Sequence, residues 1–194
     1  MRWVSSLKHL DRHARTKLSR LERRARLLRS QRDDMGNILD IHQIETEVGS
    51  LIINTQSYWS NWCRAFYLSG ALGGVTVSGT VISNGLGISS EHDALTVAIT
   101  RSLTPSKPPP PSWAAYQEPR WFAPDVLSRI LNDAQLSIAI LASTFLNSGS
   151  QALSHLRIFR NYYAHRSEPL KQEALSLGPT YLVGRPQKPS QILR

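Results

Sequence analysis

Apolar residues near the start of the sequence recur at steps of three or four positions. They are Leu7, Leu10, Ala14, Leu18, Leu21, Ala25 and Leu28. Residues at these steps share one face of a helix, so they form a narrow apolar stripe. The other faces of this helix are basic. We therefore predict a basic amphipathic helix as the N-terminal part of the chain, residues 1–35.

A second and longer helical pattern follows Gly36 and Asn37, a pair typical of a helix stop and restart. Its apolar positions keep helical spacing for about seven turns. They are Ile41, Ile44, Val48, Leu51, Ile52, Thr55, Tyr58, Trp59, Trp62 and Phe66. We expect this helix to be the backbone of the core. Its aromatic residues could stack on bases, but packing in the core is the more common role of such a stripe.

Glycine and proline mark the connections between the remaining elements. Six of the eleven glycines fall within residues 70–90, and these glycines would weaken any strand there. We predict an ordered loop in this segment, with a short hairpin as the alternative. A short helix over residues 93–101 leads into a proline-rich spacer over residues 104–123, which we expect to be extended.

Two more helices follow the spacer. Pro124 marks the start of a helix whose apolar spacing continues to Phe145. Ser150 can cap a further helix that continues through Tyr163, with Pro169 as its downstream limit. Together these elements predict a mainly α fold with one helical domain over residues 36–177. The tail, residues 178–194, has no core-forming period, and we expect it to be extended or disordered.

The charge of the chain is concentrated at one end. Residues 1–32 hold eleven basic and two acidic residues, which equals the whole formal net charge of +9. Such a density of basic side chains suits phosphate contacts on RNA. A membrane surface is an alternative, although the stripe lacks the bulky apolar face of interfacial helices. Docking on a partner protein through the stripe is another.

The cysteine count and hydropathy bear on location. The single cysteine, Cys63, cannot form an internal disulfide framework or a zinc cluster, and this favours a reducing, cytoplasmic setting. No run of eighteen apolar residues is present, so we expect no membrane span. The basic start also resembles a mitochondrial presequence, which is the less favoured alternative.

An arginine and a histidine stand near the end of the last predicted helix of the domain. Asn161 and His165 are four residues apart and share a helix face, so the amide could hold one imidazole nitrogen. Arg160 lies about 140° away from His165 around the helix. The two side chains therefore cannot converge well within one chain. A second copy across a two-fold axis would bring one motif against the other.

These residue types suit the cleavage of RNA by its own 2′-hydroxyl. Histidine can move a proton near neutral pH, and a guanidinium can hold the phosphate oxygens on which negative charge develops. The reaction needs no metal ion or other cofactor. DNA is not a substrate for it, because DNA has no 2′-hydroxyl.

The segment Phe159-Arg160-Asn161-Tyr162-Tyr163-Ala164-His165 resembles the Arg-Asn-x-x-x-His signature of the HEPN superfamily. The resemblance extends over the helical core, residues 40–168. It implies a HEPN-like helical bundle with a metal-independent endoribonuclease site at a homodimer interface. It also implies an effector of a bacterial toxin–antitoxin or antiphage defence system, with an antitoxin or another defence protein as a partner. A non-catalytic RNA-binding or scaffold subunit of a defence complex is the alternative.

The sequence departs from one branch of the superfamily. Toxins of the branch that AMP addition regulates have a tyrosine two residues after the histidine, whereas this chain has Ser167. Regulation by that modification is therefore not expected here.

Three neighbours of the motif are candidates for RNA binding. Arg157 and Arg166 add positive charge within two turns of the motif, and Tyr162 could stack on a base. We expect Tyr163 to pack in the core instead. His155 lies about 15 Å before His165 along the helix axis and is too distant to share its proton transfer within one chain.

Overall fold

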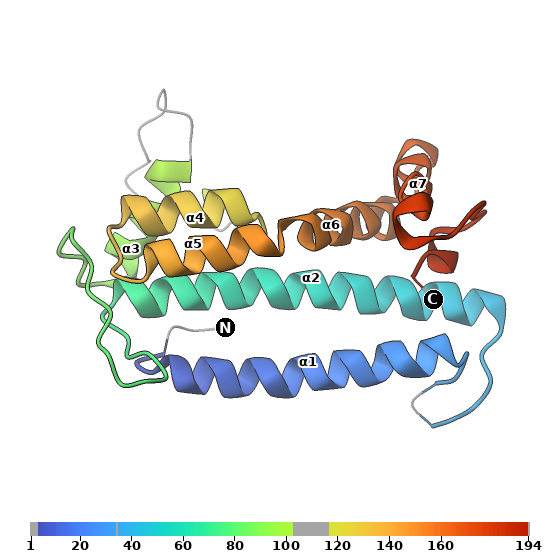
Figure 1. Cartoon of the computed structure of the whole chain (residues 1–194), viewed down its shortest axis with the longest axis horizontal. Coiled ribbons are helices and arrows are strands. Elements are labelled where there is room, and N and C mark those ends of the chain that lie inside the picture. The colour runs from blue at the N-terminus through green and yellow to red at the C-terminus, as the bar shows by residue number, and fades with distance from the viewer. Residues whose placement is uncertain (1–3, 34, 103–116, 194) are drawn as a thin grey trace. The chain divides into compact units, whose positions relative to one another are not determined.

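The computed structural model describes residues 4–33, 35–102 and 117–193, and these residues are mainly helical (Figure 1). This confirms the predicted mainly α fold. The described α-helices are α1 (Leu7–Arg29), α2 (Ile41–Ala71), α3 (Glu91–Ser102), α4 (Pro124–Asp133), α5 (Ala139–Ser148), α6 (Ser150–His165) and α7 (Glu168–Leu175). Two short 3₁₀ helices follow, η2 (Gly178–Tyr181) and η3 (Pro189–Gln191). Among these helices, none combines the length and apolar character that a membrane crossing requires.

The described chain divides into two compact units, and each is discontinuous in sequence. The first unit contains residues 1–14 and 59–150, and the second contains residues 15–58 and 151–194. Both α1 and α2 therefore contribute residues to both units. The basic N-terminal helix is thus part of the packed structure, with Leu10 buried in the first unit and Leu28 in the second.

The core of the first unit forms around the C-terminal part of α2. The fully buried Tyr67 donates a hydrogen bond from its hydroxyl to the carbonyl oxygen of Ala94 in α3, at 2.7 Å. Trp59, Trp62 and Phe66 stack on one another and are partly buried against this core. The aromatic stripe of α2 therefore packs, as predicted.

The glycine-rich segment is an ordered loop, as we expected. Val75 and Val81 form one isolated bridge, and Val75 forms another with Ser6. The side chain of Asn84 holds the loop to the end of α2, because its amide nitrogen donates to the Ala71 carbonyl at 2.8 Å. The described part of this segment contains no strand longer than such a bridge.

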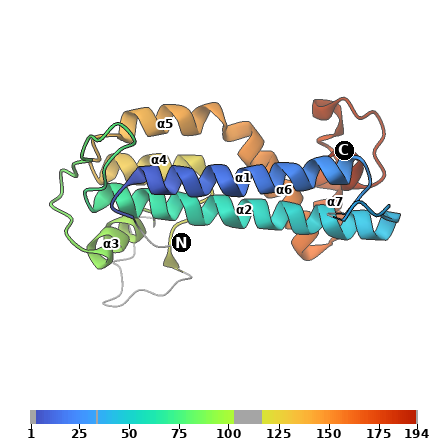
Figure 2. The same cartoon turned by 90° about the horizontal axis from the view of Figure 1, so that it is seen from below.

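The single helix predicted from Pro124 to Phe145 is wrong, because the structure has two helices there. The chain leaves α4 at Gln135, whose backbone is left-handed with φ 50°. The break joins this turn to the glycine-rich loop, since Ser137 donates its backbone N–H to the Ser83 carbonyl at 3.0 Å. Helices α4 and α5 then pack as an antiparallel pair (Figure 2). Large apolar side chains of α5 remain exposed, among them Phe145.

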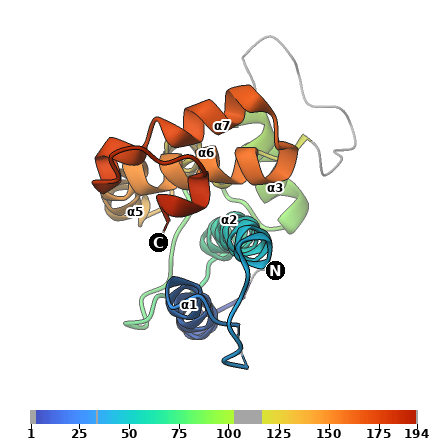
Figure 3. The same cartoon turned by 90° about the vertical axis from the view of Figure 1, so that its right-hand side faces the viewer.

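The second unit packs α2 residues 41–58 between residues 15–29 of α1 and helix α6 (Figures 1 and 3). Its buried core joins residues of α1, α2, α6, α7 and the C-terminal tail. They are Leu28, Ile44, Val48, Phe159, Tyr162, Tyr163, Ala174 and Ile192.

The C-terminal part of the chain differs from the extended or disordered tail that we expected. Residues 178–193 form two 3₁₀ turns, and Ile192 is buried in the second core. Ser190 is fully buried and donates a short hydrogen bond to the Glu45 carboxylate. Helix α7 was not predicted either, although Pro169 lies in its first turn, where proline is favoured. The proline-rich spacer predicted over residues 104–123 is described only from residue 117 onward.

Candidate active site at the end of α6

Helix α6 ends at His165 because Arg166 adopts a left-handed backbone. The φ of Arg166 is 51°, and its N–H donates to the Tyr162 carbonyl at 2.7 Å, which closes the last turn. Glycine usually occupies such a position after a helix. An arginine there leaves His165 as the last residue of the helix and turns the Arg166 side chain back toward the protein.

The buried and exposed faces of α6 divide the residues of the motif. Phe159, Tyr162 and Tyr163 point into the core of the second unit. Arg157 and His165 are exposed, and Arg160 and Asn161 are half-buried between the two faces. The core thus fixes the helix, while the residues predicted for chemistry lie outside the core.

Arg160 has no carboxylate partner within the described residues. Its Nη1 atom lies 3.5 Å from Oδ1 of Asn161, the limit of a hydrogen bond between neighbouring residues. This contact leaves the guanidinium charge uncompensated. The guanidinium can therefore bind an anion without first breaking an ion pair.

The expected contact between Asn161 and His165 is not formed. The amide oxygen of Asn161 faces Arg160, and the imidazole of His165 makes no hydrogen bond to any residue that the structure describes. His165 is accessible, as a proton-transfer group must be, but none of the side chains that the structure describes selects its tautomer.

Two of the predicted RNA-binding residues are engaged inside the second unit. The Arg166 guanidinium lies 5.2 Å from the ring centre of Tyr162 and 4.7 Å from that of Tyr163. Its Nη1 atom is also 3.7 Å from Oε2 of the buried Glu45. Tyr162 is buried, with the Arg166 guanidinium over its ring. The Arg166 side chain is still 47% exposed, and Arg157 is exposed as well. The RNA-binding roles of the three residues stay predictions.

Glu45 is a residue of this site that our sequence interpretation missed. It lies one residue after Ile44 and three before Val48, on the buried side of α2, and an acidic residue in such a place is a signal of a buried polar contact. Burial, with the negative charge of Glu45 adding to it, raises the pKa of Tyr163 well above its ordinary value. Tyr163 is buried in the second core, so it packs as we expected.

Other candidate groups of the chain have structural surroundings. His155 Nδ1 lies 2.9 Å from the Tyr181 hydroxyl and so holds the tail to α6. Cys63 is fully buried, and its burial raises the pKa of the thiol. Within the residues that the structure describes, no three His, Cys, Asp or Glu side chains gather in a way that could hold a metal ion.

Comparison of the chain with protein-family models, with curated proteins and with solved structures finds no match.

Proposed function

We propose that the chain is a metal-independent endoribonuclease of the HEPN type that cleaves RNA by attack of the 2′-hydroxyl. One observation supports this above the others. His165 and Arg157 are exposed on α6, and the half-buried Arg160 has no carboxylate partner within the described residues. Cleavage of a phosphodiester by this reaction uses a group that moves a proton and a cation that stabilises the developing negative charge.

The residues divide the chemistry between them. His165 moves the proton of the 2′-hydroxyl or of the leaving 5′-oxygen, and Arg160 stabilises the negative charge that develops on the non-bridging oxygens. Arg157 binds a neighbouring phosphate of the same strand. In this proposal Asn161 holds the Arg160 guanidinium, since its amide oxygen faces that group and not the imidazole.

A homodimer is part of the proposal. Arg160 and His165 point about 140° apart around α6, so one chain does not bring both to a single phosphate. Two copies related by a two-fold axis place Arg160 of one motif beside His165 of the other. The proposed setting is the bacterial cytoplasm, as an effector of a toxin–antitoxin or antiphage defence system that an antitoxin or another defence protein controls.

Purified protein is expected to degrade single-stranded RNA in the presence of EDTA. The products should have 2′,3′-cyclic phosphate and 5′-hydroxyl ends, because the attacking oxygen belongs to the substrate. Mass spectrometry of the fragments measures this. A matched RNA with 2′-O-methyl groups should remain intact, because it has no nucleophile. Fragments with 3′-hydroxyl ends, or cleavage that needs added metal, would show that the mechanism is wrong.

A non-catalytic RNA-binding or scaffold subunit is the second candidate. It is favoured by one observation, that no residue of the described chain orients the His165 imidazole. Such a subunit would bind the RNA in this assay and leave it intact at all protein concentrations.

Sharing of the site between two chains has a quantitative test. We expect Arg160→Ala protein and His165→Ala protein to be inactive alone and to regain activity when unfolded together and refolded as a mixture. In a mixed dimer one of the two shared sites keeps both groups, so an equal mixture should recover about a quarter of the wild-type rate. Cleavage rates of the mixture and of each variant alone measure this. No recovery, with mixed dimers shown by mass spectrometry, would place Arg160 and His165 of one chain in the same site.

A further inference from the structure

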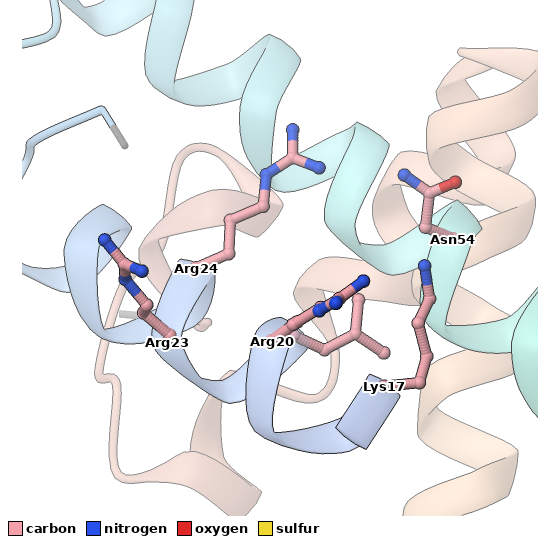
Figure 4. A pocket seen from close by; sticks show the side chains of 6 residues that line it. Lys17, Arg20, Arg23, Arg24 and Asn54 are labelled. Atoms are coloured by element: carbon pink, nitrogen blue, oxygen red, sulfur yellow. The ribbon is translucent and has the colours of Figure 1, made fainter. Parts of the chain in front are cut away.

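The second unit has a basic pocket between α1 and α2. It has a volume of about 430 Å³ and is lined by four basic residues of α1, one leucine of α1 and one amide of α2. These residues are Lys17, Arg20, Leu21, Arg23, Arg24 and Asn54 (Figure 4). In the figure, the Lys17 side chain extends toward Asn54 and the Arg24 side chain extends toward α2.

Only one of the four basic side chains is neutralised by an acid. Arg24 forms an ion pair with Glu47 of α2 and lies 3.4 Å from the Ser50 hydroxyl. Within the described part of the chain, Lys17, Arg20 and Arg23 form no ion pair or hydrogen bond. The Arg24–Glu47 pair therefore ties α1 to α2, and the pocket beside it keeps three unbalanced positive charges.

Asn54 gives the pocket a polar wall without adding an acid. Its amide nitrogen lies 3.3 Å from the Ser50 hydroxyl, so it belongs to the same polar row of α2 as Glu47 and Ser50. An amide next to ammonium and guanidinium groups suits an oxyanion, because all of these groups donate hydrogen bonds to phosphate oxygens.

We propose that this pocket binds a backbone phosphate of RNA, as a docking site distinct from the Arg160 and His165 motif. The identification of RNA as the polyanion rests on the proposed function. Figures 1 and 3 show α2 between the basic half of α1 and helix α6 within the second unit. The pocket and the motif therefore lie on different sides of α2. One segment of the RNA strand binds in the pocket, and another segment of the same strand binds at the motif.

The partly buried stripe of α1 favours RNA over a membrane or a protein partner. Leu10 and Leu28 are each buried in a unit of this chain, and Leu18 is the one residue of the stripe that is mostly exposed. An interfacial helix needs a continuous apolar face to enter a bilayer, and this stripe is already used in packing. The side chains that α1 exposes on its outer side are mainly charged.

The test removes the three unbalanced charges and measures binding apart from cleavage. The pocket variant is Lys17→Gln, Arg20→Gln and Arg23→Gln in one protein, since glutamine preserves helix propensity. The control is Lys8→Gln, Arg26→Gln and Arg29→Gln, which removes the same formal charge from α1 at positions that do not line the pocket. Of these three, Arg26 is ion-paired with Glu22. The probe is fluorescent single-stranded RNA with 2′-O-methyl groups, titrated by anisotropy at several salt concentrations.

We expect the slope of log K against log salt to become shallower by about 2 in the pocket variant, which corresponds to about 0.7 for each of three lost phosphate contacts. The control variant should keep most of the wild-type slope. An equal loss in both variants would overturn the proposal, because it would show that the helix binds through diffuse charge. Wild-type binding by the pocket variant would overturn it as well.

Two further measurements identify the kind of molecule whose phosphate the pocket binds. Inorganic phosphate that competes with the RNA probe at the affinity of the RNA itself would make the pocket a site for a small anion. Pocket-dependent binding to phosphatidylserine and phosphatidylcholine vesicles, without RNA binding, would make it a membrane site. Because the probe cannot be cleaved, a catalytically inactive protein with a pocket-dependent slope would still support the docking site and would contradict only the proposed nuclease.

Discussion

Replacing His165 by alanine is expected to slow RNA cleavage by a factor of about 10² to 10⁴, the usual contribution of a general acid or base. The fold should not change, because the imidazole is exposed and makes no hydrogen bond in the described chain. Arg160→Ala should show a loss of similar size, since its charge is available to the phosphate. Initial cleavage rates measure both effects, and circular dichroism and urea unfolding check the fold.

His42→Ala is the matched control for this variant. His42 is also exposed and also belongs to the second unit, but it lies in the first turn of α2 and has no part in the proposed chemistry. It should cleave RNA at the wild-type rate. Normal cleavage by the His165→Ala protein would contradict the assignment of this histidine to the site.

Replacing Phe159 by alanine is expected to lower the free energy of unfolding by about 3 to 5 kcal/mol, as for other large aromatic residues removed from a core. Phe159 is 1% exposed and belongs to the buried core of the second unit, which also contains residues of α1, α2, α7 and the tail. The core that holds helix α6 in place should be weakened by this change. RNA cleavage should therefore fall, even though Phe159 is not a catalytic residue. Urea unfolding followed by circular dichroism measures the stability.

Phe145→Ala provides the comparison for this prediction. It removes the same side chain from α5, where the ring is 68% exposed, and such surface changes usually alter stability by less than about 0.5 kcal/mol. If the Phe159 and Phe145 variants were equally stable, the second core as described would be wrong.

The periodicity of apolar residues predicted the helices whose limits depend on residues close to one another in the sequence. Helices α1, α2, α3 and α6 begin and end close to the positions that spacing and capping indicate. The break at Gln135 could not be predicted in this way, because apolar spacing continues across it. The break depends on the hydrogen bond between Ser137 and Ser83, residues that are distant in sequence. The folded tail was missed for the same reason, since Glu45 fixes Ser190 from the other end of the chain.

The same distinction applies to the candidate site. Helical geometry predicted that Asn161 and His165 share a face, and the burial of Tyr163 followed from the stripe of α6. The contact of Arg166 with Glu45 in α2 was not predicted, and the RNA-binding roles of Arg166 and Tyr162 stay predictions. No local pattern around the motif contains that partner. Its signal is an acidic residue on the apolar side of a helix.

The interleaved composition of the two units has a consequence for synthesis of the chain on the ribosome. The first part of α2 cannot complete its packing until later residues of the second unit have been synthesised. Glu45, for example, is separated from its partner Ser190 by 145 positions. At about 5 to 20 residues per second, translation of that interval takes roughly 7 to 30 s. During that time the second core, which includes Ile44 and Val48, is incomplete, and its exposed apolar surface is one to which chaperones can bind. The second unit, and with it the support of the Arg160 and His165 motif, completes its folding only after the first unit has all of its residues.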